Sequence, residues 1–168
     1  MKFIEQLKER AKQNKKTIVL PETSDMRTIE AAGKVLAEGI ANIILVGDKE
    51  DIMSRAGDID LSGASFVDPK NYEKFDEYVD AFVEMRRKKG MTEARARELL
   101  LTNPLYFGCM MVKQDDADGM VAGAINASAD VLRAALQTLK TAPGTRIVSA
   151  FFLVVVPDCQ YGANGTFV

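Results

Sequence analysis

The feature that most constrains the fold is the alternation of short apolar runs with amphipathic segments along the chain. Thr17–Leu20 and Asn42–Val46 are rich in β-branched side chains, and each run ends at a turn-forming residue, Pro21 or Gly47. Apolar residues recur every three or four positions between them, as in an amphipathic helix. Short, fully apolar strands are typical of a parallel sheet with both faces covered. The sequence therefore predicts an α/β fold with three layers, α/β/α, and a mainly parallel sheet.

The same periodicities predict the remaining elements. Helices are expected at 3–14, from Ser24 or Asp25 to Gly39, from 48 through about 55, at 72–85, from Thr92 through 100, from Pro104 through about 113, and at 129–139. Further strands are expected at 64–67, 120–122 and 146–156. The very apolar stretch Phe151–Val156 would need neighbours on both sides. We expect it to pack against a symmetry mate, a partner subunit or its own rearranged terminus.

Charge and composition exclude several classes of function. The chain carries 22 basic and 24 acidic residues, which gives no electrostatic case for a nucleic acid or an anionic membrane as partner. Its longest apolar run, Phe151–Val156, is far shorter than the ~20 residues of a membrane helix. The N-terminus lacks the apolar region of a secretory signal. We therefore expect a cytoplasmic protein.

The side chains available for catalysis and metal binding are limited. Histidine is absent, which excludes a Ser-His-Asp triad, a Cys-His pair and a His-ligated zinc site within these residues. Cys109 and Cys159 do not have CxxC spacing and are expected to be two buried free thiols. We expect no metal site and no permanently bound cofactor.

The stretch from Gly119 to Gly144 predicts a strand, a turn of small residues and a helix. The turn Gly123–Ser128 would let an anion approach backbone N–H groups at the start of a helix. Ser128 offers a hydroxyl group and Arg133 offers a planar set of donors that matches phosphate. The pattern therefore suggests a phosphate site, although an ordinary strand-to-helix connection with a surface arginine has the same pattern.

Two other segments carry charge in a suggestive pattern. The run Arg86–Lys89 could meet the phosphates of a nucleotide, or it could be a solvated helix end whose cations complement the helix dipole before Gly90. The segment Pro21–Arg27 follows a strand, where ligands of α/β sheets bind, but its acids can also cap a helix. Neither a Walker A nor a GxGxxG sequence is present.

Four stretches, taken in order, resemble the phosphate acetyltransferase family and together cover almost the whole chain. They are KKTIVLPETSDMRTIEAA, ANIILVGDKEDI, EMRRKKGMTEARARELL and DADGMVAGAINASADVLRAALQTLKTAPGT. The resemblance implies an isocitrate/isopropylmalate dehydrogenase-like fold of two α/β domains and a homodimer. It also implies reversible transfer of an acetyl group between acetyl phosphate and coenzyme A, with coenzyme A as a substrate and only small molecules as partners.

The resemblance also assigns roles to particular residues. Arg133 matches the arginine of the family's phosphate-binding helix, and Ser128 matches a small hydroxyl residue before it. Arg86 matches an arginine linked to coenzyme A binding, and Arg87 is its weaker neighbour. Arginines in such a site bind phosphate and stabilise the charge that develops during the reaction.

Family members are about twice as long as this chain. We therefore expect residues 1–168 to be an N-terminal segment, containing most of the first domain of a truncated family fold. The catalytic Ser-Arg pair and the Asp base would lie in the missing C-terminal half, so we expect no catalytic residue here and an inactive fragment. The open alternatives are a phosphate butyryltransferase and a non-catalytic binding or regulatory module.

Overall fold

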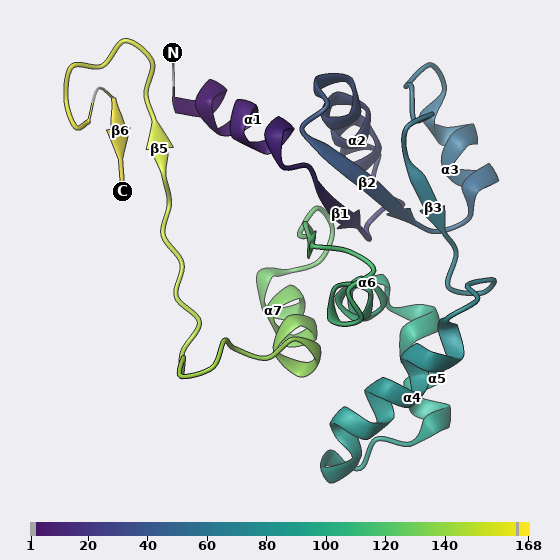
Figure 1. Ribbon diagram of the computed structural model, residues 1–168. Coiled ribbons are helices and arrows are strands. Elements are labelled where there is room, and N and C mark those ends of the chain that lie inside the picture. Colours follow the sequence, from purple (N-terminus) through teal and green to yellow (C-terminus); the bar gives the residue numbers. More distant parts are fainter. Residues whose placement is uncertain (1–2, 164) are drawn as a thin grey trace.

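The computed structural model describes residues 3–163 and 165–168, and helices alternate with strands in its first part, before a run of consecutive helices (Figure 1). The elements in chain order are α1 (Phe3–Gln13), β1 (Lys16–Leu20), α2 (Met26–Glu38), β2 (Ala41–Val46), α3 (Lys49–Ala56), β3 (Ser65–Val67), α4 (Phe75–Arg86), the 3-10 helix η1 (Arg87–Lys89), α5 (Glu93–Thr102), α6 (Pro104–Lys113), β4 (Gly119–Met120), α7 (Ser128–Thr138), β5 (Val154–Val155) and β6 (Thr166–Phe167).

The central sheet has the strand order β3-β2-β1-β4, and every pair in it is parallel. Ile18 of β1 lies beside Ile43 of β2 on one side and beside Gly119 of β4 on the other. The chain therefore leaves β1 toward β2 and β3 and later returns to the opposite edge of β1. This confirms the expected mainly parallel sheet.

Helices cover both faces of this sheet. Successive strand residues point to opposite faces, so Val19 and Ile44 pack in one cluster with α4 to α7. Leu20 and Ile43 pack in a second cluster with buried residues of α2 and α3. The burial of both faces explains why these strands are continuously apolar, and it agrees with the three-layer prediction.

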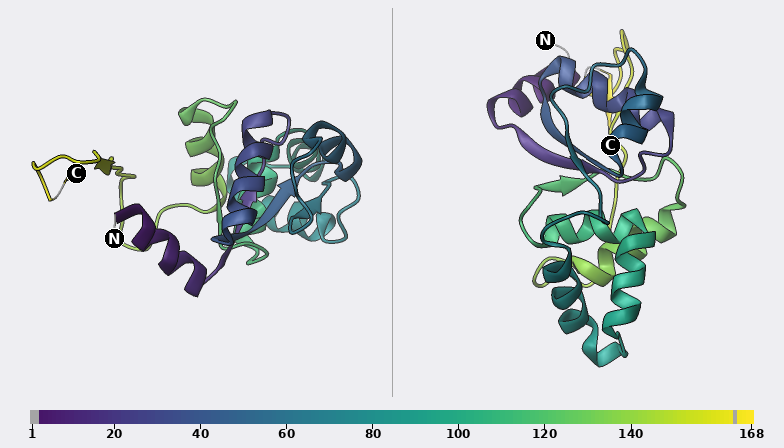
Figure 2. Two further views of the ribbon diagram at one scale, coloured as in Figure 1. Left: turned by 90° about the horizontal axis from the view of Figure 1, so that it is seen from above. Right: turned by 90° about the vertical axis from the view of Figure 1, so that its right-hand side faces the viewer.

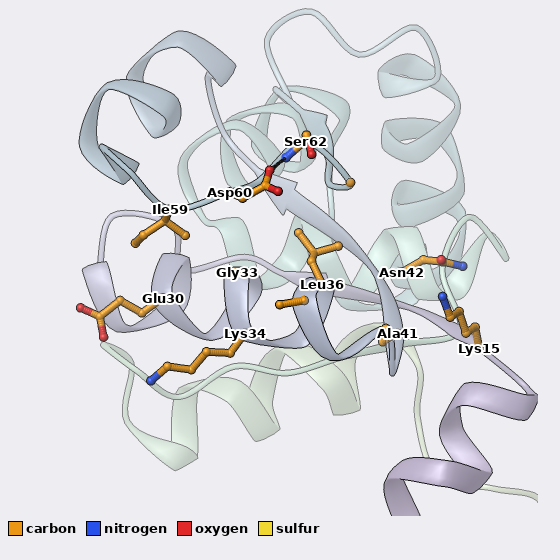
Figure 3. Close-up of a pocket in the computed structure, with 13 residues that line it drawn as sticks. Lys15, Glu30, Gly33, Lys34, Leu36, Ala41, Asn42, Ile59, Asp60 and Ser62 are labelled. Carbon is orange, nitrogen blue, oxygen red and sulfur yellow. Dashed lines mark hydrogen bonds between the residues drawn. The ribbon is translucent and has the colours of Figure 1, made fainter.

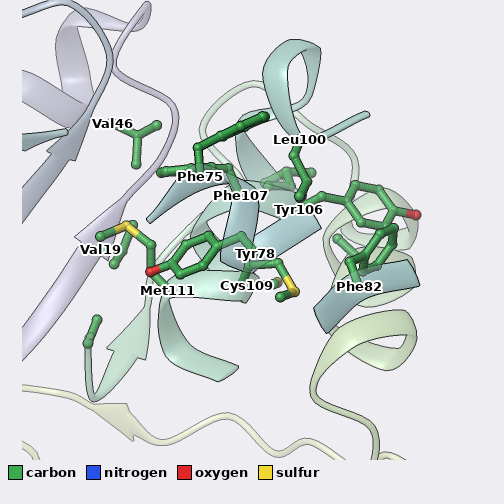
Figure 4. Close-up of a cluster of buried hydrophobic side chains, with 14 of the residues drawn as sticks. Val19, Val46, Phe75, Tyr78, Phe82, Leu100, Tyr106, Phe107, Cys109 and Met111 are labelled. Carbon is green, nitrogen blue, oxygen red and sulfur yellow. The ribbon is translucent and has the colours of Figure 1, made fainter. Parts of the chain in front are cut away.

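The larger cluster is built around the ring of Phe107 in α6 (Figure 4). The ring centroids of Tyr72, Phe75 and Tyr78 lie 5.6–6.5 Å from that of Phe107. The hydroxyl groups of Tyr72 and Tyr78 both donate to Asp116, which also forms an ion pair with Lys74. These contacts attach the start of α4 to the segment between α6 and β4.

The helix ends follow the local signals in the sequence. The side chain of Asp25 accepts from the backbone N–H of Arg27 and caps α2, which ends at Gly39 with φ = 66°. Asn103 caps α6 at Pro104, and Thr92 caps α5. Each cap gives a partner to backbone groups that a helix end would otherwise leave unpaired.

The expected strand at 146–156 is wrong. Only Val154 and Val155 form a strand there, and they pair antiparallel with β6 rather than with the central sheet. A strand forms only where a neighbour can take up its N–H and C=O groups, and within the described residues that neighbour is the short β6. The segment extends away from the rest of the molecule (Figure 2) and leaves Phe152 88% exposed. The stretch 151–156 thus pairs with the C-terminal end of the chain, which was one of the expected arrangements, but it stays largely exposed.

Candidate functional site

A cavity of about 440 Å³ lies among the helices that cover one face of the sheet. It is lined by Arg86, Lys89, Met91, Arg95, Glu98, Leu99, Thr102, Tyr106, Arg133 and Gln137. These residues come from α4 to α7 and the η1 segment, and several are four apart on one helix face, such as Arg95 and Leu99 or Arg133 and Gln137. Helix periodicity thus places the polar side chains of α5 and α7 around one space.

Arg86 is the last residue of α4 and is partly buried at this cavity. Its Nε is buried and has no hydrogen-bond partner among the residues that the structure describes. An unpaired buried donor on a charged group is costly unless a ligand or water satisfies it. The orphaned Nε therefore marks Arg86 as a group suited to bind an anion.

Arg133 lines the same cavity from α7 and remains 57% exposed on its side chain, where it pairs with Asp130. Lys89 and Arg95 add two further positive charges, and Glu98 is the carboxylate among the lining residues. Even with Asp130 paired to Arg133, the cations around the cavity outnumber the acids, and low-dielectric walls concentrate the resulting positive potential. The charge of the cavity therefore favours an anionic ligand.

Tyr106 and Gln137 give the cavity a neutral polar wall. The hydroxyl of Tyr106 donates to Oε1 of Gln137 over 3.1 Å, and the tyrosine ring packs edge-on against Phe82. Burial raises the pKa of Tyr106, while the charges of Arg133 and Arg86 act in the opposite direction. The effect of both arginines on one hydroxyl reflects how close they lie to it.

The structure brings together two of the four residues expected at the site. Arg86 and Arg133 line one cavity, which lies among helices rather than beside the turn Gly123–Ser128. Arg87 does not line it and is 74% exposed, with Glu84 3.5 Å away. Ser128 is exposed as the first residue of α7 and also lies outside the lining. The run of cations ends at Gly90, whose left-handed conformation closes η1.

The turn expected to bind phosphate is occupied by a side chain of the protein itself. The carboxylate of Glu22 accepts from the backbone N–H groups of Gly123, Ala124, Ile125 and Asn126 over 2.6–3.1 Å, and from Nδ2 of Asn126 over 2.8 Å. Converging N–H groups do form an anion site here, but Glu22 already fills it. The idea that these amides cradle a substrate phosphate is therefore corrected.

Glu22 is held firmly at the carboxyl end of β1. It is 3% exposed, and its neighbour Thr23 donates to the carbonyl of Val46 over 2.6 Å. Burial by itself would raise the pKa of Glu22, but the hydrogen bonds from Asn126, Ala124 and Gly123 outweigh burial and lower the pKa to about 2. The group is therefore a permanent anion at neutral pH.

A larger cavity of about 690 Å³ lies elsewhere, beside α2 and the amino end of β2 (Figure 3). Lys15, Lys34, Glu30 and Asp60 contribute charges that balance one another. Ligands of open α/β sheets bind beyond the carboxyl ends of strands, and this cavity adjoins Ala41 at the opposite end. The position of the larger cavity and its balanced charge therefore argue against it as an anion-binding site.

Sequence reasoning did not identify several residues of this region. Arg95, Tyr106 and Gln137 look like ordinary surface and core positions of helices, and no local pattern distinguishes them. Glu22 was placed among acids that could cap a helix, whereas Asp25 performs that role. A carboxylate directly after a buried strand is the one signal that could have pointed to Glu22, because a buried charge needs partners.

Comparison with known proteins identifies the family of the chain. The model of the phosphate acetyl/butaryl transferase family matches residues 2–167. Phosphate acetyltransferase from Acetivibrio thermocellus is 55% identical over all of this chain and 50% of its own length, and that from Thermoanaerobacterium thermosaccharolyticum is 51% identical over all of this chain and 51% of its length.

Solved structures agree with these relatives. A phosphotransacetylase from Streptococcus pyogenes has a TM-score of 0.85 at 34% identity, covering 94% of this chain and 49% of that one. The EutD phosphotransacetylase from Staphylococcus aureus has a TM-score of 0.82 at 37% identity, covering 92% and 47%. The chain spans about half the length of the relatives it matches. The described α/β fold and the match across nearly every residue show that this chain belongs to the phosphate acetyl/butaryl transferase family.

Proposed function

We propose that this chain is a substrate-binding part of a phosphate acetyltransferase, which transfers an acetyl group reversibly between acetyl phosphate and coenzyme A. The observation that carries the proposal is the cationic cavity, which is lined by both Arg133 and Arg86, whose buried Nε has no partner among the described residues. The names of the relatives support the acetyl reaction over the butyryl one. An acyl-phosphate specificity assay on the full-length protein decides between the two acyl groups.

In this proposal the two arginines divide the anions of the substrates. Arg86 binds a phosphate of coenzyme A, and Arg133 binds the phosphate of acetyl phosphate or the inorganic phosphate that is released. A guanidinium presents paired donors that match a phosphate group. Arg87 and Ser128 are weaker candidates for the same two roles, because both lie outside the cavity.

The proposal gives this chain binding and orientation rather than the proton-transfer step. In such a reaction a base takes the thiol proton of coenzyme A, and the thiolate attacks the carbonyl carbon of acetyl phosphate. Glu22 is unsuited as that base because five donors occupy its carboxylate. We propose that the base and its Ser-Arg partners belong to the half of the family's length that this chain does not span, and that residues 1–168 form most of the first domain.

The assembly and location of the protein are also proposals. We infer a homodimer that acts on small molecules in the cytoplasm, without nucleic acid or membrane as a partner. Among the described residues, no helix combines the length and the apolar character that crossing a bilayer requires. Size-exclusion chromatography with light scattering on the full-length protein measures the oligomeric state directly.

The binding role is tested with coenzyme A and the 168-residue chain by isothermal titration calorimetry. Arg86→Gln should weaken the binding of coenzyme A about tenfold or more, since a hydrogen bond to a charged group contributes about 1.5–3 kcal/mol. Arg133→Gln should weaken the binding of inorganic phosphate, titrated in a separate experiment, by a similar factor. Lys88→Gln is the matched control, because Lys88 belongs to the same cationic run but does not line the cavity. Equal losses in all three variants would mean that general charge, and not the cavity, attracts the ligand.

A further inference from the structure

The turn Gly123–Asn126 depends on an anion for its conformation. Four successive backbone N–H groups converge on one point there, together with Nδ2 of Asn126. Converging N–H dipoles repel one another unless a negative charge lies between them. Gly123 adopts φ = 111°, which other residues rarely adopt, and so allows the turn to begin.

The anion comes from a distant part of the chain. Glu22 lies 101–104 residues before its partners, and two of its donors bind Oε2 while three bind Oε1. An ionised carboxylate has about four lone-pair sites, so these donors saturate it. A saturated, buried carboxylate has no free capacity to bind substrate or to accept a proton.

The turn leads directly into the helix that carries Arg133. Asn126 is two residues before Ser128, where α7 begins, and the side chain of Ala127 offers no cap of its own. The turn is also held from the other side, because Nη2 of Arg27 donates to the carbonyl of Ala124 over 2.5 Å. The direction in which α7 starts is therefore decided by the contacts of this turn.

We propose that Glu22 is a positioning residue. Its carboxylate fills the nest of converging backbone N–H groups at Gly123–Asn126 and thereby sets the start of α7. The orientation of α7 in turn directs Arg133 into the cationic cavity. The inference rests on the proposed function only for the identity of the ligand. A purely structural role would make Glu22 stabilise the fold without changing how Arg133 meets its ligand.

The first test compares Glu22→Gln with Asp48→Asn in the 168-residue chain. Asp48 follows the neighbouring strand and caps α3, so its variant removes a charge at the same edge of the sheet without touching the turn. In Glu22→Gln an amide group meets donors that need an acceptor. Hydrogen exchange at the four turn amides should accelerate about tenfold or more, and the affinity for inorganic phosphate, the ligand assigned to Arg133, should fall about tenfold.

Two readouts separate positioning from stability. The NMR resonance of the Nε–H group of Arg133 should shift in Glu22→Gln and stay unchanged in Asp48→Asn. Urea unfolding gives the stability of each variant, so that affinity is compared between folded molecules. An unchanged Arg133 resonance together with wild-type affinity in folded Glu22→Gln would overturn the proposal, whatever the loss of stability.

A second variant covers the case in which Glu22→Gln does not fold. Glu22→Ala leaves the nest open to a small free carboxylate, and formate should restore both the Arg133 resonance and the affinity for inorganic phosphate. Chloride at equal ionic strength should not restore either. If formate restores the fold but not the resonance, Glu22 is structural only and the proposal is wrong.

The arginine variants test the proposed ligands independently of the role of Glu22. If Arg86→Gln does not change the affinity for coenzyme A and Arg133→Gln does not change the affinity for inorganic phosphate, the ligand assignment fails. The Arg133 resonance in the Glu22 variants still decides whether Glu22 positions that side chain. If those arginine variants weaken binding while Glu22→Gln leaves both readouts unchanged, the ligand assignment stands and the positioning role fails.

Discussion

The acid sensitivity of the fold should depend measurably on Glu22. Its carboxylate is 3% exposed and is paired with five donors, which lower its pKa from an ordinary value of 4.5 to about 2. Each pKa unit corresponds to about 1.4 kcal/mol. Ionised Glu22 therefore contributes about 3 kcal/mol to the free energy of unfolding at neutral pH.

The direction of the effect follows from the lowered pKa. The folded state holds Glu22 ionised, whereas the unfolded chain takes up a proton at a pKa near 4.5. The stabilisation is complete above about pH 5 and is lost as the pH falls toward 2. Glu22→Gln has no proton to take up at this position, so its stability should fall less over the same window.

The measurement is urea unfolding of the wild-type chain and of Glu22→Gln at a series of pH values from 7 to 2.5. Asp25 and Asp118 also have lowered pKa values, so both proteins should lose stability in acid. The difference between them isolates Glu22 and should shrink by about 2–3 kcal/mol on acidification. Losing the contribution of about 3 kcal/mol from ionised Glu22, as in Glu22→Gln, leaves a typical domain folded at neutral pH. A difference that stays constant across the series would refute the assignment of a strongly ionised, nest-bound Glu22.

Two further predictions concern the core and the C-terminal segment. Phe107→Ala should lower the free energy of unfolding by about 3–5 kcal/mol because it opens a cavity among the rings of Tyr72, Phe75 and Tyr78. Phe107→Leu should lower the free energy of unfolding by less than half as much. Equal losses in urea unfolding would show that the ring is not tightly packed. Deleting residues 146–168 should change the free energy of unfolding by less than about 1 kcal/mol, since that segment buries little apolar surface. The deletion should also reduce self-association, measured by light scattering. A large loss of stability would show that the segment packs against the rest of the protein.

Much of the fold can be predicted from local sequence. The runs at 17–20 and 42–46 correspond to β1 and β2, and the predicted helix ends at Asp25 and Gly39 are those of α2. These features depend on a few neighbouring residues, through apolar periodicity, capping hydrogen bonds and the conformational freedom of glycine. The family resemblance likewise resides in continuous stretches, and it indicated Arg86 and Arg133 before any geometry was known.

The tertiary structure decided what depends on residues far apart in the chain. Glu22 meets Gly123–Asn126 across about 100 positions, so the turn that looked open to phosphate is closed by a side chain that no local pattern connects with it. Arg86 and Arg133 reach one cavity only because α4 to α7 pack together, whereas Arg87, one residue away, points elsewhere. The stretch 146–156 has every local mark of a strand, yet strand formation requires a hydrogen-bonding neighbour, and the packed chain provides one only at Val154 and Val155.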